Sequence, residues 1–228
     1  MIAKNNVCIL IPAYNEEKKV GEVIREVERQ GYTVLVVDDG STDGTPAVIE
    51  GTGAYSIFLA KNQGKGAAIR KGFDWVMTNG YEGVIVMDAD GQHAPQQLDE
   101  FLKVLSPIEA DVVVGNRMGG DLKDMPFLRR MTNVSMSALI SAVIGQHVPD
   151  TQCGFRAFTQ EALKRMRLRT SRFEIESEML LVAGRISLKI KSIPILTVYR
   201  GELSHIKPCL DTLRFLNFFM RFIFFKNN

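Results

Sequence analysis

The sequence is poor in the features that mark several common classes of protein. Its three cysteines, Cys8, Cys153 and Cys209, lie far apart and form no CxxC pair, which argues against a disulfide framework or a zinc knot. The formal net charge is only +2, so bulk charge gives no support for nucleic acid as a partner. Residues 1–6 lead into a short apolar run that ends near Pro12. This pattern is typical of neither a signal peptide nor a membrane span. We therefore expect a cytoplasmic protein.

Two nucleotide-binding fingerprints are also missing. No GxGxxG sequence follows the first predicted strand, which disfavours a dehydrogenase. Gly64 and Lys65 are followed by Gly66 rather than by Ser or Thr, which disfavours a P-loop nucleoside triphosphatase. Any nucleotide must therefore be bound by other motifs.

Short apolar runs alternate with segments of helical periodicity. Strands are expected at residues 7–11, 32–37, 56–59, 84–87, 112–114 and 155–158. Helices are expected at residues 20–27, 66–77, 95–106, 134–144 and 173–183. The alternation predicts an α/β fold, with a mostly parallel central sheet flanked by helices. A chain of 228 residues is long enough for one such domain.

Polar turns follow four of the predicted strands, at residues 12–16, 38–41, 88–92 and 115–117. Open parallel sheets bind ligands beyond the carboxyl ends of their strands, so the functional site is expected there. Asp88 and Asp90 follow the end of one predicted strand, where carboxylates on alternate residues can bind Mg²⁺ or Mn²⁺ together with substrate phosphates. The alternative for this Asp-x-Asp sequence is a solvated turn that caps the next helix.

Two other segments favour ligand binding. Asp38 and Asp39 are adjacent carboxylates after a buried strand, and their repulsion favours a ligand or metal partner for at least one. The same segment also reads as a turn in which Thr42 or Asp43 caps a helix. Residues 61–66 offer backbone donors and two lysines at a helix start, which predicts an anion site.

Taken in order, these motifs resemble the inverting family-two glycosyltransferases, which have a nucleotide-diphospho-sugar (GT-A-like) fold. The likeness is carried by IPAYNEE at 11–17, VDDGS at 37–41, NQGKG at 62–66 and MDADGQH at 87–93. GNR at 115–117 and DTQCGFR at 150–156 resemble the dolichyl- or polyprenyl-phosphate sugar synthases in particular. The resemblance covers roughly residues 5–210. It implies metal-dependent transfer of a hexose from a GDP-mannose or UDP-glucose type of donor to a polyprenyl or dolichyl phosphate.

The resemblance also implies roles for individual residues. The base and ribose of the donor would be held by Pro12, Tyr14, Glu16 and Asp39. The metal and the diphosphate would be bound by Asp88, Asp90 and Gln92, and the expected substrate site also includes Lys65 and Ala89. Candidates for binding phosphates are Arg117, Arg130, His205 and Lys207, with a surface ion pair as the alternative for each arginine. Catalysis is expected to depend on Asp88, Asp90 and Arg117.

One motif of many relatives is missing. Members that glycosylate hydroxyl groups carry an acidic base before a Gln-x-x-Arg-Trp sequence, whereas the single tryptophan here, Trp75, lies in a predicted helix. A phosphate acceptor is already largely ionised at neutral pH and needs little proton removal. Asp150 or Glu176 remains open as a base toward a sugar hydroxyl in glycan or cell-envelope polysaccharide synthesis. A nucleotide-sugar-binding scaffold without turnover is the non-enzymatic alternative.

The C-terminal segment, residues 210–228, is expected to form an amphipathic helix apart from a catalytic domain of residues 1–209. It holds six of the thirteen phenylalanines, with a narrow polar stripe formed by Asp211, Arg214, Asn217 and Arg221. It is too short and too charged to cross a bilayer, which takes about 20 apolar residues. An interfacial helix at the inner face of the membrane is expected, and packing on the core or another subunit is the alternative.

Overall fold

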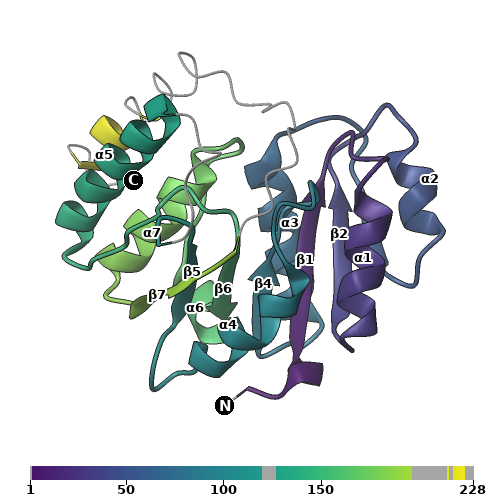
Figure 1. Ribbon diagram of the computed structural model, residues 1–228, viewed down its shortest axis with the longest axis horizontal. Coiled ribbons are helices and arrows are strands. Elements are labelled where there is room, and N and C mark those ends of the chain that lie inside the picture. The colour runs from purple at the N-terminus through teal and green to yellow at the C-terminus, as the bar shows by residue number, and fades with distance from the viewer. Residues whose placement is uncertain (1, 120–126, 197–214, 216–217, 224–228) are drawn as a thin grey trace.

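The central feature of the computed structural model is a mixed seven-stranded sheet with helices on both faces (Figure 1). The structure describes residues 2–119, 127–196, 215 and 218–223. The strand order is β3-β2-β1-β4-β6-β5-β7, and only β6 runs antiparallel to its neighbours. The strands are β1 Val7–Ala13, β2 Thr33–Asp38, β3 Tyr55–Phe58, β4 Gly83–Val86, β5 Val112–Asn116, β6 Arg156–Thr159 and β7 Ile190–Pro194.

The helices cover a sheet whose inner strands are apolar on both sides. Every residue of β1 is buried, as expected for a parallel strand covered on both faces. Helices α1 and α4 lie on one face of the sheet and α3 and α6 on the other (Figure 1). The helices are α1 Val20–Arg29, α2 Thr45–Glu50, α3 Lys65–Thr78, α4 Leu98–Val104, α5 Phe127–Ile144, α6 Gln160–Arg165 and α7 Ile175–Arg185, with short 3-10 turns at Lys4–Asn6 and Pro95–Gln97.

The direction of the strands brings distant residues to one edge of the sheet. Strands β1, β2 and β4 are parallel, so the turns that follow them lie at the same edge. Because β6 runs the opposite way, residues 150–155 reach that edge before the strand begins. At Gly40, with φ +70°, an added Cβ would lie 2.4 Å from the carbonyl carbon of Lys61. Only glycine therefore allows the turn after β2 to contact the loop before α3.

The sequence predictions of the fold are confirmed in type and order. Three short elements, α2, α6 and β7, had no predicted range: α2 and α6 have only six residues each, and the apolar pattern of β7 is interrupted by Lys191 at the sheet edge. Helix α5 begins at Phe127, earlier than the predicted residue 134, and most of residues 130–135 are exposed, so this part of the helix lacks the apolar periodicity. Gly44 occupies the N-cap position of α2, but the capping contact predicted for Thr42 or Asp43 is made by Asp43, whose Oδ1 accepts a 3.0 Å hydrogen bond from the backbone N–H of Thr45 at the start of the helix.

The described part of the C-terminal segment packs on the body of the protein. Residues 218–223 are helical, and Phe215 and Phe219 are buried. Arg185 of α7 donates a 2.5 Å hydrogen bond to the carbonyl oxygen of Phe222, and its guanidinium carbon lies 3.6 Å from the centre of that ring. Among the described residues, no helix has the length and apolarity that a membrane crossing requires. The division into residues 1–209 and 210–228 remains a prediction.

Candidate active site

Asp88 lies at the point where three distant segments meet. It follows β4, and its Oδ1 lies 2.7 Å from Nζ of Lys65 at the start of α3. Its Oδ2 lies 3.4 Å from Nε2 of His93, and a Cβ added to Gly154 would lie 2.4 Å from the same oxygen. The glycine before β6 is therefore required for the backbone to approach this carboxylate. Burial opposes ionisation of Asp88, but the charge of Lys65 and the contact with His93 outweigh it and lower its pKa.

Lys65 connects Asp88 to a second carboxylate. Its Nζ lies 2.7 Å from Oε1 of Glu176, which belongs to the first turn of α7 and is 8% exposed. Burial would lower the pKa of the ammonium group, but Asp88 and Glu176 outweigh burial and raise it. Lys65 is therefore a charged group held between β4 and α7.

Asp90 lies close to Asp88 but in a different electrostatic environment. Its Oδ1 accepts a 2.9 Å hydrogen bond from the backbone N–H of Gln92. Burial, followed by the charge of Asp88, raises its pKa. A carboxylate that is held ionised, Asp88, beside one whose ionisation it opposes, Asp90, suits a hard divalent cation, which would complete its shell with phosphate oxygens and water. Within residues 2–119, 127–196 and the described tail, no group of three His, Cys, Asp or Glu side chains forms a metal cage.

The adjacent carboxylates after β2 find their partners within the chain. Asp38 accepts hydrogen bonds of 2.5 Å from Oγ and 3.0 Å from the backbone N–H of Ser41. Asp39 accepts from the backbone N–H groups of Gln63 at 2.8 Å and Gly64 at 2.7 Å. In the structure the backbone donors of Gln63 and Gly64 bind Asp39, and the ammonium of Lys65 binds two carboxylates. An anion site at residues 61–66 stays a prediction.

Arg117 and Asp150 form a buried ion pair. Nε of Arg117 lies 2.7 Å from Oδ2 of Asp150, and its NH2 nitrogen lies 2.9 Å from Oδ1. The side chains of both residues are almost fully buried. Burial opposes ionisation of Asp150, but Arg117 outweighs it and lowers the pKa of this carboxyl. Asp150 is thus poorly suited to act as a base, since its proton affinity is reduced and its two oxygens are engaged.

Arg156 was not predicted as a site residue. Its side chain is fully buried, and it donates hydrogen bonds to the backbone carbonyl oxygens of Cys153 at 2.8 Å, Thr151 at 2.7 Å and Glu176. It therefore fixes the segment before β6 to the first turn of α7. Two signals in the sequence could have identified it: an arginine within the apolar stretch GFRAF, and its place at the end of the DTQCGFR motif.

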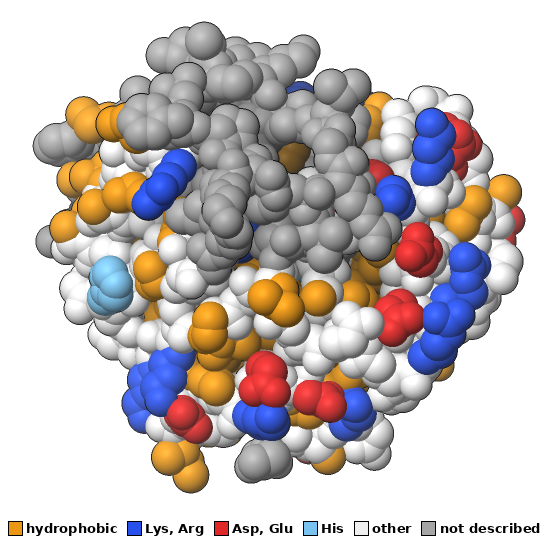
Figure 2. Space-filling model, in the orientation of Figure 1, with side chains coloured by type: hydrophobic (Ala, Val, Ile, Leu, Met, Phe, Trp, Pro, Cys, Tyr) orange, Lys and Arg blue, Asp and Glu red, His pale blue; other side chains and the backbone are white. Residues whose placement is uncertain are grey.

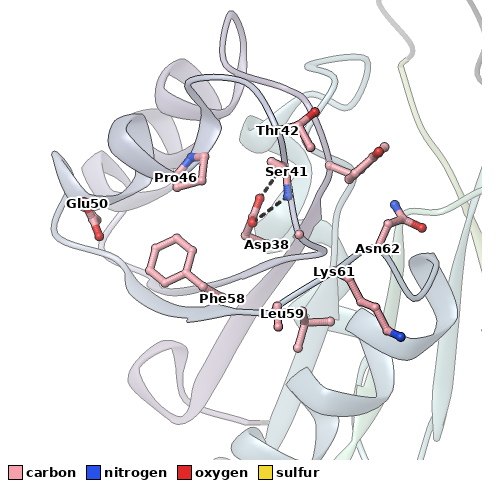
Figure 3. Close-up of a pocket in the computed structure, with 12 residues that line it drawn as sticks. Asp38, Ser41, Thr42, Pro46, Glu50, Phe58, Leu59, Lys61 and Asn62 are labelled. Carbon is pink, nitrogen blue, oxygen red and sulfur yellow. Dashed lines mark hydrogen bonds between the residues drawn. The ribbon is translucent and has the colours of Figure 1, made fainter.

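A pocket of about 430 Å³ opens beside the carboxyl ends of β1 and β2 (Figure 3). The turns that shape it are joined by Asn15, whose Oδ1 accepts a 2.8 Å hydrogen bond from the backbone N–H of Thr42. The backbone N–H of Asn15 in turn donates to Oγ of Ser41 at 2.8 Å. The lining residues are Tyr14, Asp38, Gly40, Ser41, Thr42, Pro46, Glu50, Phe58, Leu59, Ala60, Lys61 and Asn62.

The pocket contains only some of the residues predicted to bind the donor. Tyr14 lines it, whereas Pro12 and Asp39 are buried and do not. Phe58, at the end of β3, was missed, although 42% of it is exposed and its ring faces the pocket (Figure 3). Glu16 is held near the pocket, since its backbone N–H donates to Oγ1 of Thr45 at 2.8 Å.

The other predicted site residues do not all lie at the carboxyl ends of the strands. Ala89 is buried between the two aspartates, and Gln92 is partly buried in the same turn. Arg130 is exposed on α5. His205 and Lys207 lie outside the described residues.

Comparison with known proteins gives the family. Residues 8–167 match the profile of glycosyl transferase family 2. The chain belongs to this family. As a family 2 glycosyltransferase it is an enzyme, and the scaffold alternative is set aside.

Two curated relatives of this glycosyltransferase act on lipid phosphates according to their names. It is 33% identical to the UDP-N-acetylglucosamine–dolichyl-phosphate N-acetylglucosaminyltransferase of Methanococcus voltae, over 87% of this chain and 88% of the relative. It is 30% identical to the undecaprenyl-phosphate mannosyltransferase of Micrococcus luteus, over 85% and 84% of the two chains. The expected relationship of this chain to dolichyl- and polyprenyl-phosphate sugar transferases is confirmed.

The fold is also confirmed by solved structures. The glucosyl-3-phosphoglycerate synthase of Mycobacterium tuberculosis, in complex with Mn²⁺ and UDP-glucose, superposes with a TM-score of 0.67 at 21% identity. The match covers 91% of this chain and 73% of that one. At this identity the likeness shows the GT-A-like fold alone.

The buried Arg117–Asp150 pair predicts a pH-dependent loss of stability on substitution. Asp150→Asn should lower the free energy of unfolding by about 3–5 kcal/mol at pH 7, because it leaves a buried guanidinium without its counter-charge. The folded-state pKa of Asp150 is lowered, so its contribution is full above the unfolded value of about 3.9 and is lost as pH falls through the folded value. The difference from wild type should shrink below about pH 4, measured by urea unfolding.

A surface pair provides the control. Glu161→Gln removes a carboxylate that lies 3.8 Å from Lys164 on the exposed side of α6, and its effect should be near zero at every pH. An Asp150→Asn protein with wild-type stability at pH 7 would contradict the assignment.

Proposed function

We propose that this family 2 glycosyltransferase moves a sugar from a nucleotide diphosphate sugar to a polyprenyl or dolichyl phosphate, with the help of Mg²⁺ or Mn²⁺. The observation that carries the proposal is the state of the candidate bases. Asp150 is paired with Arg117, and Glu176 is paired with Lys65. An acceptor that arrives already ionised suits a site whose carboxylates are held by cations, because it needs no base. The names of the two curated relatives support the same acceptor.

The proposed mechanism is a direct displacement with inversion at the anomeric carbon. Asp88 and Asp90 would hold a divalent cation, and this ion would supply positive charge that stabilises the leaving diphosphate. Lys65 adds a positive charge at the same edge of the sheet. Arg117 acts from the turn after β5, where Asp150 fixes the orientation of its guanidinium. These groups are placed before the reaction, so little reorganisation opposes it.

The donor nucleotide is assigned to the pocket beside β1 and β2. Tyr14 and Phe58 offer aromatic surfaces to a base, and the exposed carboxylate of Glu50 offers acceptors to hydroxyl groups. Pro12, Glu16 and Asp39 support the turns around it rather than line it. The sugar is a hexose of the GDP-mannose or UDP-glucose type or, on the name of one relative, N-acetylglucosamine.

The surface around α5 supports a lipid acceptor. Exposed apolar side chains gather on the flank that α5 forms (Figure 2). Those on α5 are Met131, Val134, Leu139 and Val143, and Met220 and Ile223 are exposed on the helical tail. Neither α5 nor the described tail, residues 215 and 218–223, contains Asp or Glu, so no acidic side chain in these residues repels anionic headgroups. We place this flank in the interface of the membrane, with the enzyme peripheral at its inner face.

Transfer into lipid tests the function. Labelled GDP-mannose, UDP-glucose and UDP-N-acetylglucosamine are incubated with undecaprenyl or dolichyl phosphate and Mg²⁺ or Mn²⁺, and extracted with organic solvent. Label from one donor should enter the organic phase. Asp88→Asn and Asp90→Asn should each reduce this at least about 100-fold, because charge stabilisation of the leaving group is lost. Asp74→Asn, an exposed aspartate on α3, is the matched control.

Two results would overturn parts of this proposal. Label that reaches only water-soluble products, with every donor, would exclude the lipid acceptor. Undiminished turnover by both Asp88→Asn and Asp90→Asn would exclude their role in binding the metal.

Vesicle sedimentation tests the membrane-facing flank. Leu139→Ser combined with Val143→Ser should weaken binding to phosphatidylglycerol-containing vesicles about tenfold, because two apolar side chains no longer enter the interface. Ile108→Ser, at a residue that is 87% exposed on another part of the surface, should leave binding unchanged. Equal binding by wild type and the double variant would reject the assignment of this flank.

A further inference from the structure

The bridge formed by Lys65 is not explained by donor binding alone. Its ammonium lies 2.7 Å from Asp88 Oδ1 and 2.7 Å from Glu176 Oε1, so one cation is shared by two carboxylates from different elements. Only 16% of the lysine side chain is exposed. A lysine at the entrance of a phosphate site usually extends toward solvent, where its strongly hydrated charge is stabilised.

Each carboxylate oxygen of Asp88 already has a partner within the chain. Asp88 Oδ1 binds Lys65, and Asp88 Oδ2 faces His93 at 3.4 Å. A divalent ion that binds Asp88 must therefore compete with the ammonium for the carboxylate. Two positive charges within about 4 Å repel each other strongly in a partly buried site, so the ion and the lysine cannot both keep this contact at full strength.

Glu176 offers the ammonium a second position. Its backbone carbonyl is fixed by Arg156, and its side chain already contacts Nζ of Lys65. When Lys65 leaves Asp88, the ammonium can stay paired with Glu176 and turn its remaining donors toward the diphosphate. The flexible stem of lysine permits this movement without a change in the backbone.

We propose that Lys65 is the resident counter-cation of Asp88 in the donor-free enzyme, and that Glu176 retains it when the metal arrives with the donor. The inference rests on the proposed function of Asp88 and Asp90. Lys65 and Glu176 are then positioning residues that make binding of the divalent ion depend on the donor diphosphate. A free ion has to displace the ammonium of Lys65 from Asp88 without giving it a new partner. An ion that arrives with the diphosphate brings phosphate oxygens that accept hydrogen bonds from the displaced ammonium. By linkage, the ion and the nucleotide strengthen each other's binding.

Binding of Mn²⁺, rather than turnover, tests this. The free ion is titrated by electron paramagnetic resonance with protein alone, then with UDP or GDP present. The coupling factor is the dissociation constant for Mn²⁺ alone divided by that with nucleotide. Lys65→Met should bind Mn²⁺ alone about tenfold more tightly than wild type, and its coupling factor should fall about tenfold. Lys71→Met, an exposed lysine on the same helix, should match wild type.

A second variant should move the other way. Glu176→Gln leaves Asp88 as the only charged partner of Lys65, so Mn²⁺ alone should bind several-fold more weakly. A merely structural role for the two residues would weaken Mn²⁺ binding in both variants, with and without nucleotide alike, and this result overturns the proposal. An unchanged coupling factor in Lys65→Met overturns it as well. If wild type binds no Mn²⁺ even with nucleotide, the metal assignment itself fails, which is distinguishable from failure of the coupling alone.

Discussion

The structure depends on one electrostatic constraint: carboxylates gathered at one edge of the sheet must be neutralised. Parallel strands bring the turn after β4, which carries both Asp88 and Asp90, to the same edge as the turns after β1 and β2, and α7 adds Glu176 there. In water these charges would be solvated, but here they are partly buried and repel one another. Lys65 supplies the compensating charge through two contacts of 2.7 Å. The carboxylates at this edge therefore require a positive charge between them, and in this structure the ammonium of Lys65 supplies it.

The surrounding elements hold this arrangement in place. Arg156 binds three backbone carbonyl oxygens and fixes the segment before β6 against α7. Gly154 in that segment can approach Asp88 only because it lacks a Cβ. Asp39 accepts hydrogen bonds from the backbone N–H groups of Gln63 and Gly64, and these bonds orient the loop that precedes Lys65. The scaffold is thus held by hydrogen bonds to the backbone, while the charged side chains remain at the site.

What the sequence could predict follows from the range of the interactions. The alternating strands and helices and the Asp88–Asp90 turn are local patterns, so the fold and the acidic strand end could be predicted. The family resemblance added the expected residue roles. The contact between Lys65 and Glu176 joins residues 111 positions apart, and no local pattern contains it. The role of Arg156 was likewise missed, because its partners are backbone carbonyls. Phe58 could not be identified from the sequence, because its place in the pocket depends on where β3 lies relative to the turns after β1 and β2.

The most direct measurement is a crystal structure of the enzyme with Mn²⁺ and a nucleoside diphosphate. We expect an ion in direct contact, about 2 Å, with oxygens of Asp88 or Asp90 and with phosphate oxygens. We also expect the ammonium of Lys65 to have left Asp88 and to contact Glu176 and the diphosphate. An ion bound away from both aspartates, with Lys65 still on Asp88, would contradict this mechanism.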